Sequence, residues 1–284
     1  MATMVIGAGF AGAAVCDALE AGGSPHVVID IPTHPWLVDR DDAAAVLLRA
    51  ELDAGGVDRI VNATGRLRGT EDEMHAANVA FSRWLVAALA GTGVRLVHLG
   101  SAAEYGDPGS AEPVAETATC RPEGLYGETK HAGTLAVLGA RAAGLDATVA
   151  RGFNLVSAHL APVSPLAQWL RDVAALPDSG GTIEVWEADT VRDYILLADM
   201  AAGLAELAVH DGPLPEVVNL CSGVGLRYGD VVAAMVSAAG KSAEVVSLGQ
   251  GGIMTVIGDN RLLTELTGLV PRMSVELLVG HAGL

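Results

Sequence analysis

The sequence is poor in cysteine and shows none of the spacings typical of a metal site. Its three cysteines, Cys16, Cys120 and Cys221, lie far apart and form no CxxC pair. An odd, scattered set of this kind argues against a disulfide framework and against a zinc site. The eight histidines show no HxH or HxxxH spacing, and His98 lies in an apolar run. We therefore expect no metal, and we expect His98 to be a hydrogen-bonded core residue.

Basic side chains are also scarce. The chain has 17 Lys and Arg against 34 Asp and Glu, which gives a formal net charge of −17. A nucleic-acid-binding protein needs a basic face to replace the counterions around phosphates, so this balance argues against nucleic acid as a partner. One small phosphorylated ligand remains compatible, because a helix N-terminus and a few arginines can bind it locally.

Long apolar runs are absent as well. No stretch of 18 or more apolar residues occurs, which predicts no membrane-spanning helix, and the opening MATMVIGAG has no basic region typical of a signal peptide. We expect a cytoplasmic protein. Neither a GxSxG elbow nor a GxxxxGK[ST] loop is present, which argues against a serine hydrolase and a P-loop nucleotidase.

The first half of the chain alternates short apolar runs with helical patterns. Such alternation predicts an α/β fold of the Rossmann type, a doubly wound parallel sheet covered on both faces. The second half is interrupted by Pro162, Pro165 and Pro177, and residues 178–181 resemble a turn. We predict an NAD(P)-binding domain over 1–151, to which later segments return, and a small C-terminal lobe over 152–284 that mainly binds substrate. Strands are expected at 4–6, 27–30, 59–62, 95–99 and 147–150, and helices at 10–21, 42–52, 71–90 and 126–143.

A GxGxxG loop links the first predicted strand to the first helix. Gly7 permits the tight turn, Gly9 lets a pyrophosphate approach the backbone, and Gly12 allows close packing of helix on strand. Phe10 and Ala11 open the helix, whose N-terminus offers amide donors and a positive dipole end to phosphates. The loop predicts a dinucleotide site, with a plain tight turn as the alternative.

Asp30 ends the second predicted strand, 23 residues after Gly7. An acidic residue at about this distance accepts hydrogen bonds from the ribose hydroxyls and repels a 2′-phosphate, so NAD(H) is favoured. Because His34 lies four residues further on, NADP(H) stays open. The alternative for Asp30 is an ordinary solvated residue at a strand end.

A serine, a tyrosine and a lysine suggest proton transfer coupled to hydride transfer. Tyr126 and Lys130 are four residues apart at the start of a predicted helix and so share a face. A nearby ammonium favours phenolate, so we expect a lowered pKa for Tyr126. Ser101 follows the strand at 95–99, where its hydroxyl can hold a substrate oxygen for the tyrosine.

Together these motifs, in this order, resemble the extended short-chain dehydrogenases/reductases of the NAD-dependent epimerase/dehydratase family. The resemblance covers nearly the whole chain. It rests on GAGFAG (7–12), NATG (62–65), Asn78, GSAAEYG (100–106), PVAE (113–116), YGETK (126–130), RGFN (151–154), VRDYILLADMAAGL (191–204), VNLCSGVGLRYGDVV (218–232) and DNRLLTELTGLVP (259–271).

The resemblance implies roles for individual residues. Ser101, Tyr126 and Lys130 would be the catalytic triad, with Tyr126 and Lys130 also contacting the cofactor. Ala63 and Thr64 would line the cofactor and Asn78 would lie beneath the active site. Asn154 and Arg192 would face the substrate, whose diphosphate suits a guanidinium fork. The alternatives are a turn-capping role for Asn154 and an ion pair between Arg192 and Asp193.

The resemblance also implies an activity, the reduction of a keto group on a nucleotide-linked sugar. The same triad run in both directions on a retained NAD gives a nucleotide-sugar epimerase instead. The chain is short for the family, has Trp36-Leu37 where an adenine-contacting Asp is common, and has Gly249-Gln250-Gly251-Gly252 in place of a segment that usually carries an arginine. Reduction of a non-nucleotide natural-product ketone, or a non-enzymatic scaffold, therefore stays open. An extra apolar face on the helices at 71–90 and 126–143 suggests a homodimer interface, with burial of that face against the sheet as the alternative.

Overall fold

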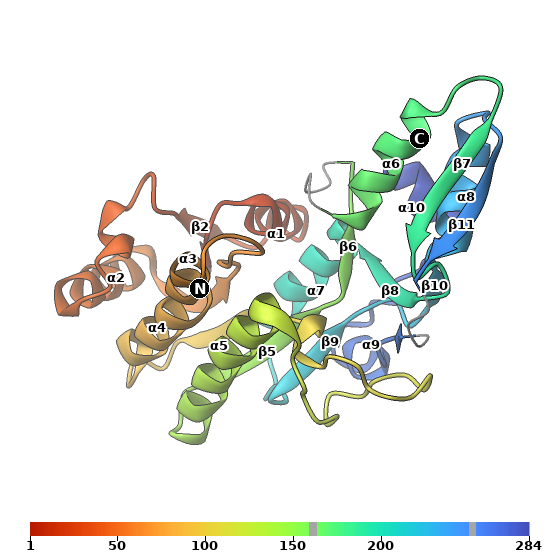
Figure 1. Ribbon diagram of the computed structural model, residues 1–284. Coiled ribbons are helices and arrows are strands. Elements are labelled where there is room, and N and C mark those ends of the chain that lie inside the picture. Colours follow the sequence, from red (N-terminus) through yellow and green to blue (C-terminus); the bar gives the residue numbers. More distant parts are fainter. Residues whose placement is uncertain (159–163, 250–253, 284) are drawn as a thin grey trace.

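A six-stranded parallel sheet forms the centre of the protein, which is described here by a computed structural model covering residues 1–158, 164–249 and 254–283 (Figure 1). The strand order is β2-β1-β3-β4-β5-β9, so the direction of winding reverses beside β1. This is the predicted doubly wound arrangement, in which ligands bind at the carboxyl ends of the strands near the reversal. The strands are β1 (Ala2–Ile6), β2 (His26–Ile29), β3 (Val57–Asn62), β4 (Arg95–Ser101), β5 (Ala147–Gly152) and β9 (Val217–Leu220).

Helices cover both faces of this sheet. On one face, α1 (Phe10–Ala21) and α7 (Leu197–Val209) pack on Val5, Val97 and Ala150. On the other face lie α2 (Asp42–Gly55), α4 (Phe81–Leu89) and α5 (Gly124–Ala142). They pack on the alternate residues of the same strands, such as Ile6 and Leu96. Because successive side chains in a strand point to opposite faces, strands that are apolar throughout fill both cores.

The helix expected over 71–90 is divided. It consists of α3 (Glu71–His75), a π-helical turn η2 (Ala76–Ala80), and α4. The π turn lies at a close approach of α5, since a Cβ on Gly133 would stand 2.3 Å from the Asn78 carbonyl oxygen. That oxygen accepts from the Ser82 hydroxyl at 2.9 Å. Such turns are frequent at functional sites, and an amphipathic pattern alone does not reveal them.

The second half of the chain builds a separate lobe and also returns to the sheet. Its strands are β6 (Asn154–Val156), β7 (Gly181–Trp186), β8 (Val191–Leu196), β10 (Gly225–Arg227), β11 (Ala243–Leu248) and β12 (Thr255–Val256). They pack with α6 (Pro165–Ala175), α8 (Tyr228–Ala238) and α10 (Val275–His281) around a core of their own. Between these segments, α7, β9 and α9 (Arg261–Thr267) rejoin the central sheet (Figure 1).

The prolines act as local start and stop signals. Pro165 opens α6 at its first turn, behind the N-cap Ser164, instead of interrupting a helix. A turn follows Pro177, whose carbonyl accepts from the Gly180 amide at 3.0 Å, and β7 begins at Gly181. Pro162 lies outside the described residues.

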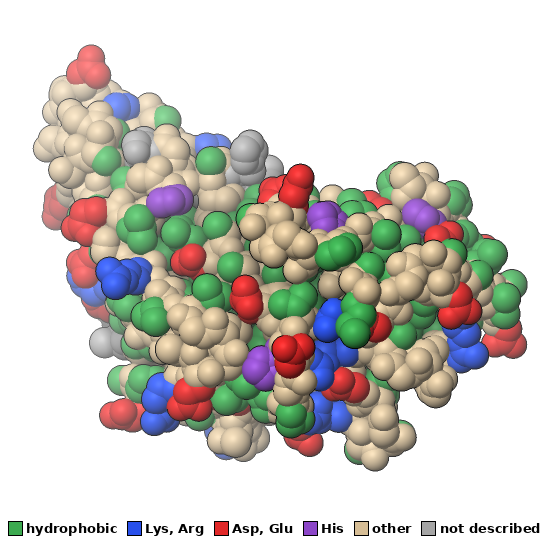
Figure 2. Space-filling view, turned by 180° about the vertical axis from the view of Figure 1, so that it is seen from behind, with side chains coloured by type: hydrophobic (Ala, Val, Ile, Leu, Met, Phe, Trp, Pro, Cys, Tyr) green, Lys and Arg blue, Asp and Glu red, His purple; other side chains and the backbone are tan. Residues whose placement is uncertain are grey.

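The surface carries both charge signs. On the face shown in Figure 2, acidic and basic side chains are interspersed with apolar ones. Within the described residues, no helix combines the length and the apolar character that crossing a membrane would need.

Candidate active site

The glycine loop has the geometry that a dinucleotide requires. Gly7 has a φ of 93°, and a Cβ on Gly12 would stand 1.8 Å from the Gly7 carbonyl oxygen, so both positions need glycine. Gly9 is the N-cap of α1 and has nothing within 4 Å of an added Cβ. No side chain caps this end of α1, so its amides, beginning near Phe10 and Ala11, can bind phosphate oxygens.

The residues predicted to line the cofactor lie beside this loop. Thr64 contacts Gly7, since a Cβ on Gly7 would be 3.1 Å from the Thr64 methyl carbon, and the Ala63 amide donates to the Ile6 carbonyl at 3.0 Å. The Asn62 side chain fixes the turn by accepting from the Thr64 amide at 3.1 Å and from its hydroxyl at 2.7 Å. These contacts bring the ends of β1 and β3 together at the point where the winding reverses.

Asp30 follows β2 at the same edge. The Gly7 amide donates to the carbonyl of the preceding Ile29 at 2.9 Å, which places Asp30 next to the glycine loop. Its carboxylate accepts from the Ile31 amide at 2.9 Å and is half-buried. His34 reaches Thr33 through Nδ1 at 2.9 Å and lies edge-on to Trp36.

Trp36 and Leu37 belong to the core. They lie in a 3-10 turn, η1 (Pro35–Val38), where Leu37 is buried and Trp36 packs against the cluster under α2 and α4. The short connection between β2 and α2 uses these side chains for packing. Of the Gly249–Gly252 stretch, only Gly249 lies within the described residues.

The predicted triad comes together at the carboxyl end of β4. Ser101 ends this strand, and Tyr126 and Lys130 lie in the first two turns of α5. The Tyr126 phenol lies near enough to the Ser101 hydroxyl for the serine to lower its pKa, and Ser101 Oγ accepts from the Ala103 amide at 3.2 Å. Lys130 is buried, and its Nζ donates to the Leu99 carbonyl at 2.6 Å.

Lys130 points toward the predicted cofactor side. A Cβ on Gly65 would stand 3.6 Å from Lys130 Nζ and 3.4 Å from Asn78 Oδ1, so the lysine lies close to the loop after β3. Asn78 accepts from the Arg66 amide at 2.7 Å and donates to the Thr129 hydroxyl at 3.0 Å. It therefore connects the loop after β3 to α5 beneath the triad.

The electrostatics of the pair differ from the prediction. Burial raises the pKa of Tyr126; the hydrogen bond with Ser101 opposes this and the charge of Glu104 adds to it. Burial lowers the pKa of Lys130 to about 8, against the attraction of Glu104. The expected lowering of the tyrosine pKa by the lysine is wrong for this structure, because desolvation outweighs the attraction and Nζ is engaged by the Leu99 carbonyl.

Asn154 and Arg192 lie on the neighbouring strands β6 and β8. Asn154 donates to the Asp193 carbonyl at 2.7 Å and is otherwise exposed. Arg192 donates through Nη1 to the Met254 carbonyl at 2.7 Å, and its guanidinium lies 5.8 Å from the centre of the Tyr228 ring. The two residues are brought to one region, where Asn154 donates to a carbonyl of the neighbouring strand and does not cap a turn.

Asp193 has partners of its own. Its buried carboxylate accepts from the amides of Ser222, Gly223 and Gly258 and from the Ser222 hydroxyl, at 2.8–3.1 Å. Burial raises its pKa to about 6 against these donors. Among the ion pairs of the described residues, none joins Arg192 to Asp193, because adjacent side chains of β8 point to opposite faces.

His98 is the core residue that the sequence predicted. It is buried in β4, and its Nδ1 lies 2.9 Å from Asn62 Nδ2, which donates to it. Burial lowers its pKa to about 3, with Lys130 adding to the effect and Glu104 opposing it, so the ring stays neutral.

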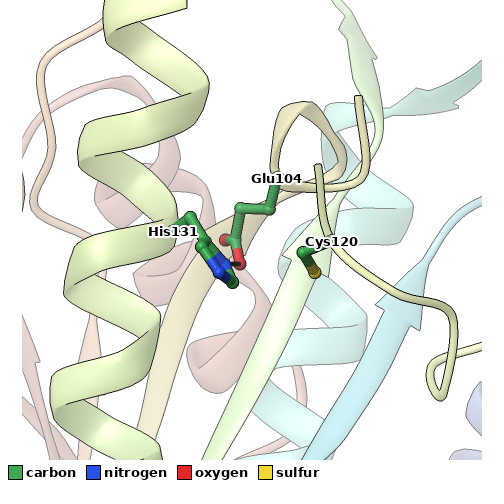
Figure 3. A group of neighbouring side chains, drawn as sticks. All are labelled: Glu104, Cys120 and His131. Atoms are coloured by element: carbon green, nitrogen blue, oxygen red, sulfur yellow. Dashed lines mark ion pairs between the residues drawn. The ribbon is translucent and has the colours of Figure 1, made fainter. Parts of the chain in front are cut away.

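One buried carboxylate near the triad escaped the sequence analysis. Glu104, in the 3-10 turn η3 (Ala102–Glu104), is fully buried and ion-paired with Arg151 at 3.0 Å. Glu104, Cys120 and His131 each offer one atom that could bind a metal ion, and these three atoms lie within 4.8 Å of one another (Figure 3). Arg151 already supplies a positive charge there, and burial raises the pKa of Cys120, which disfavours the thiolate that a metal prefers. A glutamate inside an otherwise small-residue motif was the available signal.

A doubly wound sheet with a glycine loop and a serine, tyrosine and lysine at its carboxyl edge defines a dinucleotide-dependent oxidoreductase fold. The sequence profile of the NAD dependent epimerase/dehydratase family matches residues 3–221, and the chain belongs to this family.

Two curated relatives and two solved structures illustrate the similarity. A dTDP-6-deoxy-L-talose 4-dehydrogenase (NAD(P)(+)) of Kitasatospora kifunensis is 31% identical over 71% of this chain, and the match spans 65% of that protein's length. A UDP-glucose 4-epimerase of Azospirillum brasilense is 29% identical over 98% of this chain and 93% of its own.

The solved structures show the same fold at lower identity. RMD from Pseudomonas aeruginosa, complexed with NADPH, has a TM-score of 0.80 at 21% identity over 99% of this chain and 98% of its own. A UDP-glucuronic acid 4-epimerase from Bacillus cereus, in complex with NAD, has a TM-score of 0.81 at 16% identity over 99% and 97%.

Proposed function

We propose that this protein reduces a keto group of a nucleotide-linked sugar with a nicotinamide cofactor. The observation that carries the proposal is the meeting of Ser101, Tyr126 and Lys130 at the end of β4, beside a glycine loop open to a pyrophosphate. The dehydrogenase and the epimerase to which the chain is similar are named for dTDP- and UDP-linked sugars, which supports this substrate class.

The residues at the sheet edge fit NAD(H). Gly9 leaves space at the uncapped start of α1, and Asp30 offers a carboxylate next to the loop. A bound nicotinamide would supply the hydride. NADP(H) stays a second option, since His34 rather than an arginine follows Asp30 and one structural neighbour is complexed with NADPH.

The chain's own residues supply the proton and hold the oxygen. With its pKa raised by burial, Tyr126 keeps its proton at neutral pH and donates it to the substrate oxygen as hydride reaches carbon. Ser101 accepts from the Ala103 amide, so with substrate bound its hydroxyl can turn its proton from Tyr126 to that oxygen and orient it. Lys130 Nζ, between the Leu99 carbonyl and Gly65, is placed to bind the cofactor ribose.

Substrate binding falls to the second lobe. Asn154 lies on β6 and Arg192 on the neighbouring strand β8, and β6 follows the carboxyl end of β5. The Arg192 guanidinium can pair with a diphosphate. We propose that residues 152–284 mainly form this lobe, while 1–151 with the returning β9 hold the cofactor.

Epimerisation is the second candidate, and one observation favours it. The UDP-glucose 4-epimerase matches nearly the full length of both chains, whereas the dehydrogenase match is partial. An epimerase would run the same triad in both directions on a cofactor that it retains.

Turnover of added cofactor separates these reactions. The purified protein is mixed with NADH or NADPH and a panel of keto-sugar nucleotides, and absorbance at the dihydronicotinamide band is followed. We expect cofactor oxidation that depends on the keto-sugar nucleotide. Tightly retained NAD with sugar epimerisation and no net oxidation would support the second candidate, and activity on a carbohydrate-free ketone alone would overturn both.

A thermal-shift comparison narrows the set of candidate ligands before any activity assay. Ligands that bind the native state raise its melting temperature, so NAD(H), NADP(H) and sugar nucleotides can be ranked directly. We expect the largest shift for NAD(H) combined with a sugar nucleotide.

A further inference from the structure

A buried carboxylate lies directly behind the catalytic serine. Glu104 Oε1 accepts hydrogen bonds from the Ser101 amide at 2.8 Å and from the Thr134 hydroxyl at 2.9 Å. Its Oε2 accepts from Arg151 Nε at 3.0 Å. The side chain is fully buried, so every polar contact that it makes is with the protein.

These partners come from β4 and α5, which carry the triad, and from the neighbouring strand β5. Ser101 ends β4, Thr134 lies two turns after Tyr126 on α5, and Arg151 lies on β5, which pairs with β4. Figure 3 shows Glu104 between α5, which contributes His131, and the loop that carries Cys120. One carboxylate therefore connects the serine to the helix of the tyrosine.

The same turn sets the direction of the serine side chain. Ser101 Oγ accepts from the Ala103 amide while Glu104 accepts from the Ser101 amide, which is the reciprocal pattern of a capping box. In a long helix this pattern stabilises the first turn. Here the turn η3 has only three residues, so its main effect is to fix the residue that begins it.

Arg151 holds Glu104 in place from the other side. Its guanidinium lies 4.5 Å from the centre of the Tyr105 ring, and the Arg151 side chain is buried. A buried pair of this kind costs desolvation on both sides, and removing one partner leaves an unpaired buried charge. Such a pair beside a proton-transfer site calls for a reason beyond stability.

The charge of Glu104 acts on the reacting groups. It faces Arg151 from β5, Lys130 and His131 from α5, His98 from β4, and Cys120 from the loop. Its negative charge raises the pKa of Tyr126 and opposes the lowering of the pKa of Lys130. Both effects favour the protonated forms of Tyr126, which would donate the proton, and of Lys130, which would bind the ribose.

We propose that Glu104 is a positioning residue for the reaction, which fixes Ser101 against Tyr126 and places a permanent negative charge behind the proton donor. The inference rests on the proposed function, because it assigns Tyr126 the role of donor. It differs from a purely structural ion pair in one respect: the charge of Glu104, and not only its hydrogen bonds, is needed.

Ionisation of Tyr126 can be measured without a substrate. The protein is labelled with 3,5-difluorotyrosine, whose phenol ionises at lower pH, and its four tyrosines are followed by ¹⁹F NMR, with Tyr126→Phe giving the assignment. In Glu104→Gln we expect the pKa of Tyr126 to fall by on the order of 1, because a nearby like charge is removed. An unchanged pKa in a folded Glu104→Gln protein would overturn the proposal.

Two control variants separate charge from contact. Glu116→Gln removes a half-buried carboxylate whose charged neighbours are Asp259 and Arg261, and it should leave the pKa of Tyr126 unchanged. Thr134→Val removes one hydrogen bond to Glu104 but keeps its charge, and should also leave that pKa unchanged. An equal fall in either control would count against the proposal.

A second variant guards against misfolding. If Glu104→Gln is unstable because Arg151 loses its partner, the double variant Glu104→Gln/Arg151→Gln removes both buried charges, and two amides can pair. We expect the pKa of Tyr126 to fall here too, since Glu104, and not Arg151, is among the groups that set it. A pKa equal to that of the wild type in this folded variant would refute the role of the charge.

Catalysis tests the geometric half of the proposal. Glu104→Val, which removes the acceptor of the Ser101 amide, should lower kcat by about 10- to 100-fold with little change in cofactor Kd, the scale of a small misplacement of reacting groups. An unaltered kcat would contradict the positioning role. If the wild type transfers no hydride to any keto-sugar nucleotide, the proposed function fails while the NMR result still decides whether Glu104 controls Tyr126.

Discussion

At the scale of single residues, the proposed reaction depends on the proton of Tyr126. Its neighbours leave the phenol protonated near neutral pH, since burial and Glu104 outweigh the hydrogen bond with Ser101. This state suits a donor to a ketone oxygen and fits the reductive direction. In the oxidative direction the phenol would have to lose its proton first, which predicts faster oxidation at higher pH.

Replacing the tyrosine tests this role directly. Tyr126→Phe removes the proton donor and should lower kcat at least ~100-fold, the scale of general acid catalysis. The cofactor should still bind, because the glycine loop and Asp30 are untouched. Turnover close to that of the wild type would rule out Tyr126 as the donor; cofactor titration provides the control for folding.

We predict that cofactor choice depends on Asp30. In Asp30→Ala the carboxylate that repels a 2′-phosphate is gone, so we expect the ratio of kcat/KM for NADPH over NADH to rise roughly tenfold, the equivalent of about 1.4 kcal/mol. Asp39→Ala, which removes an exposed charge further along the same connection, is the matched control. A cofactor ratio that stays the same in Asp30→Ala would show that Asp30 does not face the ribose.

Residue types at fixed spacings predicted which residues of the candidate site lie close together, but not their electrostatics. The sequence predicts that Ser101, Tyr126 and Lys130 come together, because a strand end and a helix face determine where they lie. It does not predict that Lys130 is buried and bonded to the Leu99 carbonyl, or that Glu104 faces the triad from behind. Both depend on how deeply α5 packs on β4, which no local pattern contains.

At the scale of elements, two glycines of the same loop should differ in effect: Gly12 matters for stability and Gly9 for cofactor binding. Gly12→Ala would place a Cβ against the Gly7 carbonyl and should lower the free energy of unfolding by about 1–3 kcal/mol, the cost of overpacking. Gly9→Ala meets no atom within 4 Å, so its stability should match the wild type while its cofactor Kd rises. Urea unfolding and cofactor titration on both variants check this, and equal cofactor affinity for Gly9→Ala and wild type would exclude close approach at Gly9.

Elements of the first half follow from the sequence, whereas those of the second half do not. Strands β1 to β5 appear near their predicted bounds because apolar runs of this length have few other uses in an α/β protein. The split of residues 71–90 by a π turn depends on the contact between Gly133 and Asn78. The short strands of the second lobe pair with partners far away in the sequence, such as β12 with β8, and carry little periodicity of their own.

At the scale of the whole molecule, the buried His98 makes stability depend on pH. Its pKa in the folded state, about 3, lies below the ordinary value of 6.5, so the unfolded chain binds more protons between these values. Stability should therefore be lost as the pH falls from about 6.5 toward 3, by several kcal/mol at most. His98→Gln, which can still accept from Asn62, should flatten this part of the profile, and an identical slope in the two proteins would contradict the assignment.

Association of two copies is the remaining expectation from the sequence. Leu135 on α5 is 54% exposed, and we predict that this helix contributes to a homodimer. Leu135→Glu should shift the mass measured by light scattering from two chains to one. A wild type that is already monomeric at micromolar concentration would disprove the prediction.

The return of β9 to the sheet has a consequence for how the protein is made. Until residues 197–209 leave the ribosome, α7 is absent from one face of the sheet, and until residues 217–220 follow, β5 is an unpaired edge, although the first five strands are already synthesised. Nascent chains of this protein therefore expose an apolar sheet surface for an extended part of translation, a period in which chaperones have most to protect.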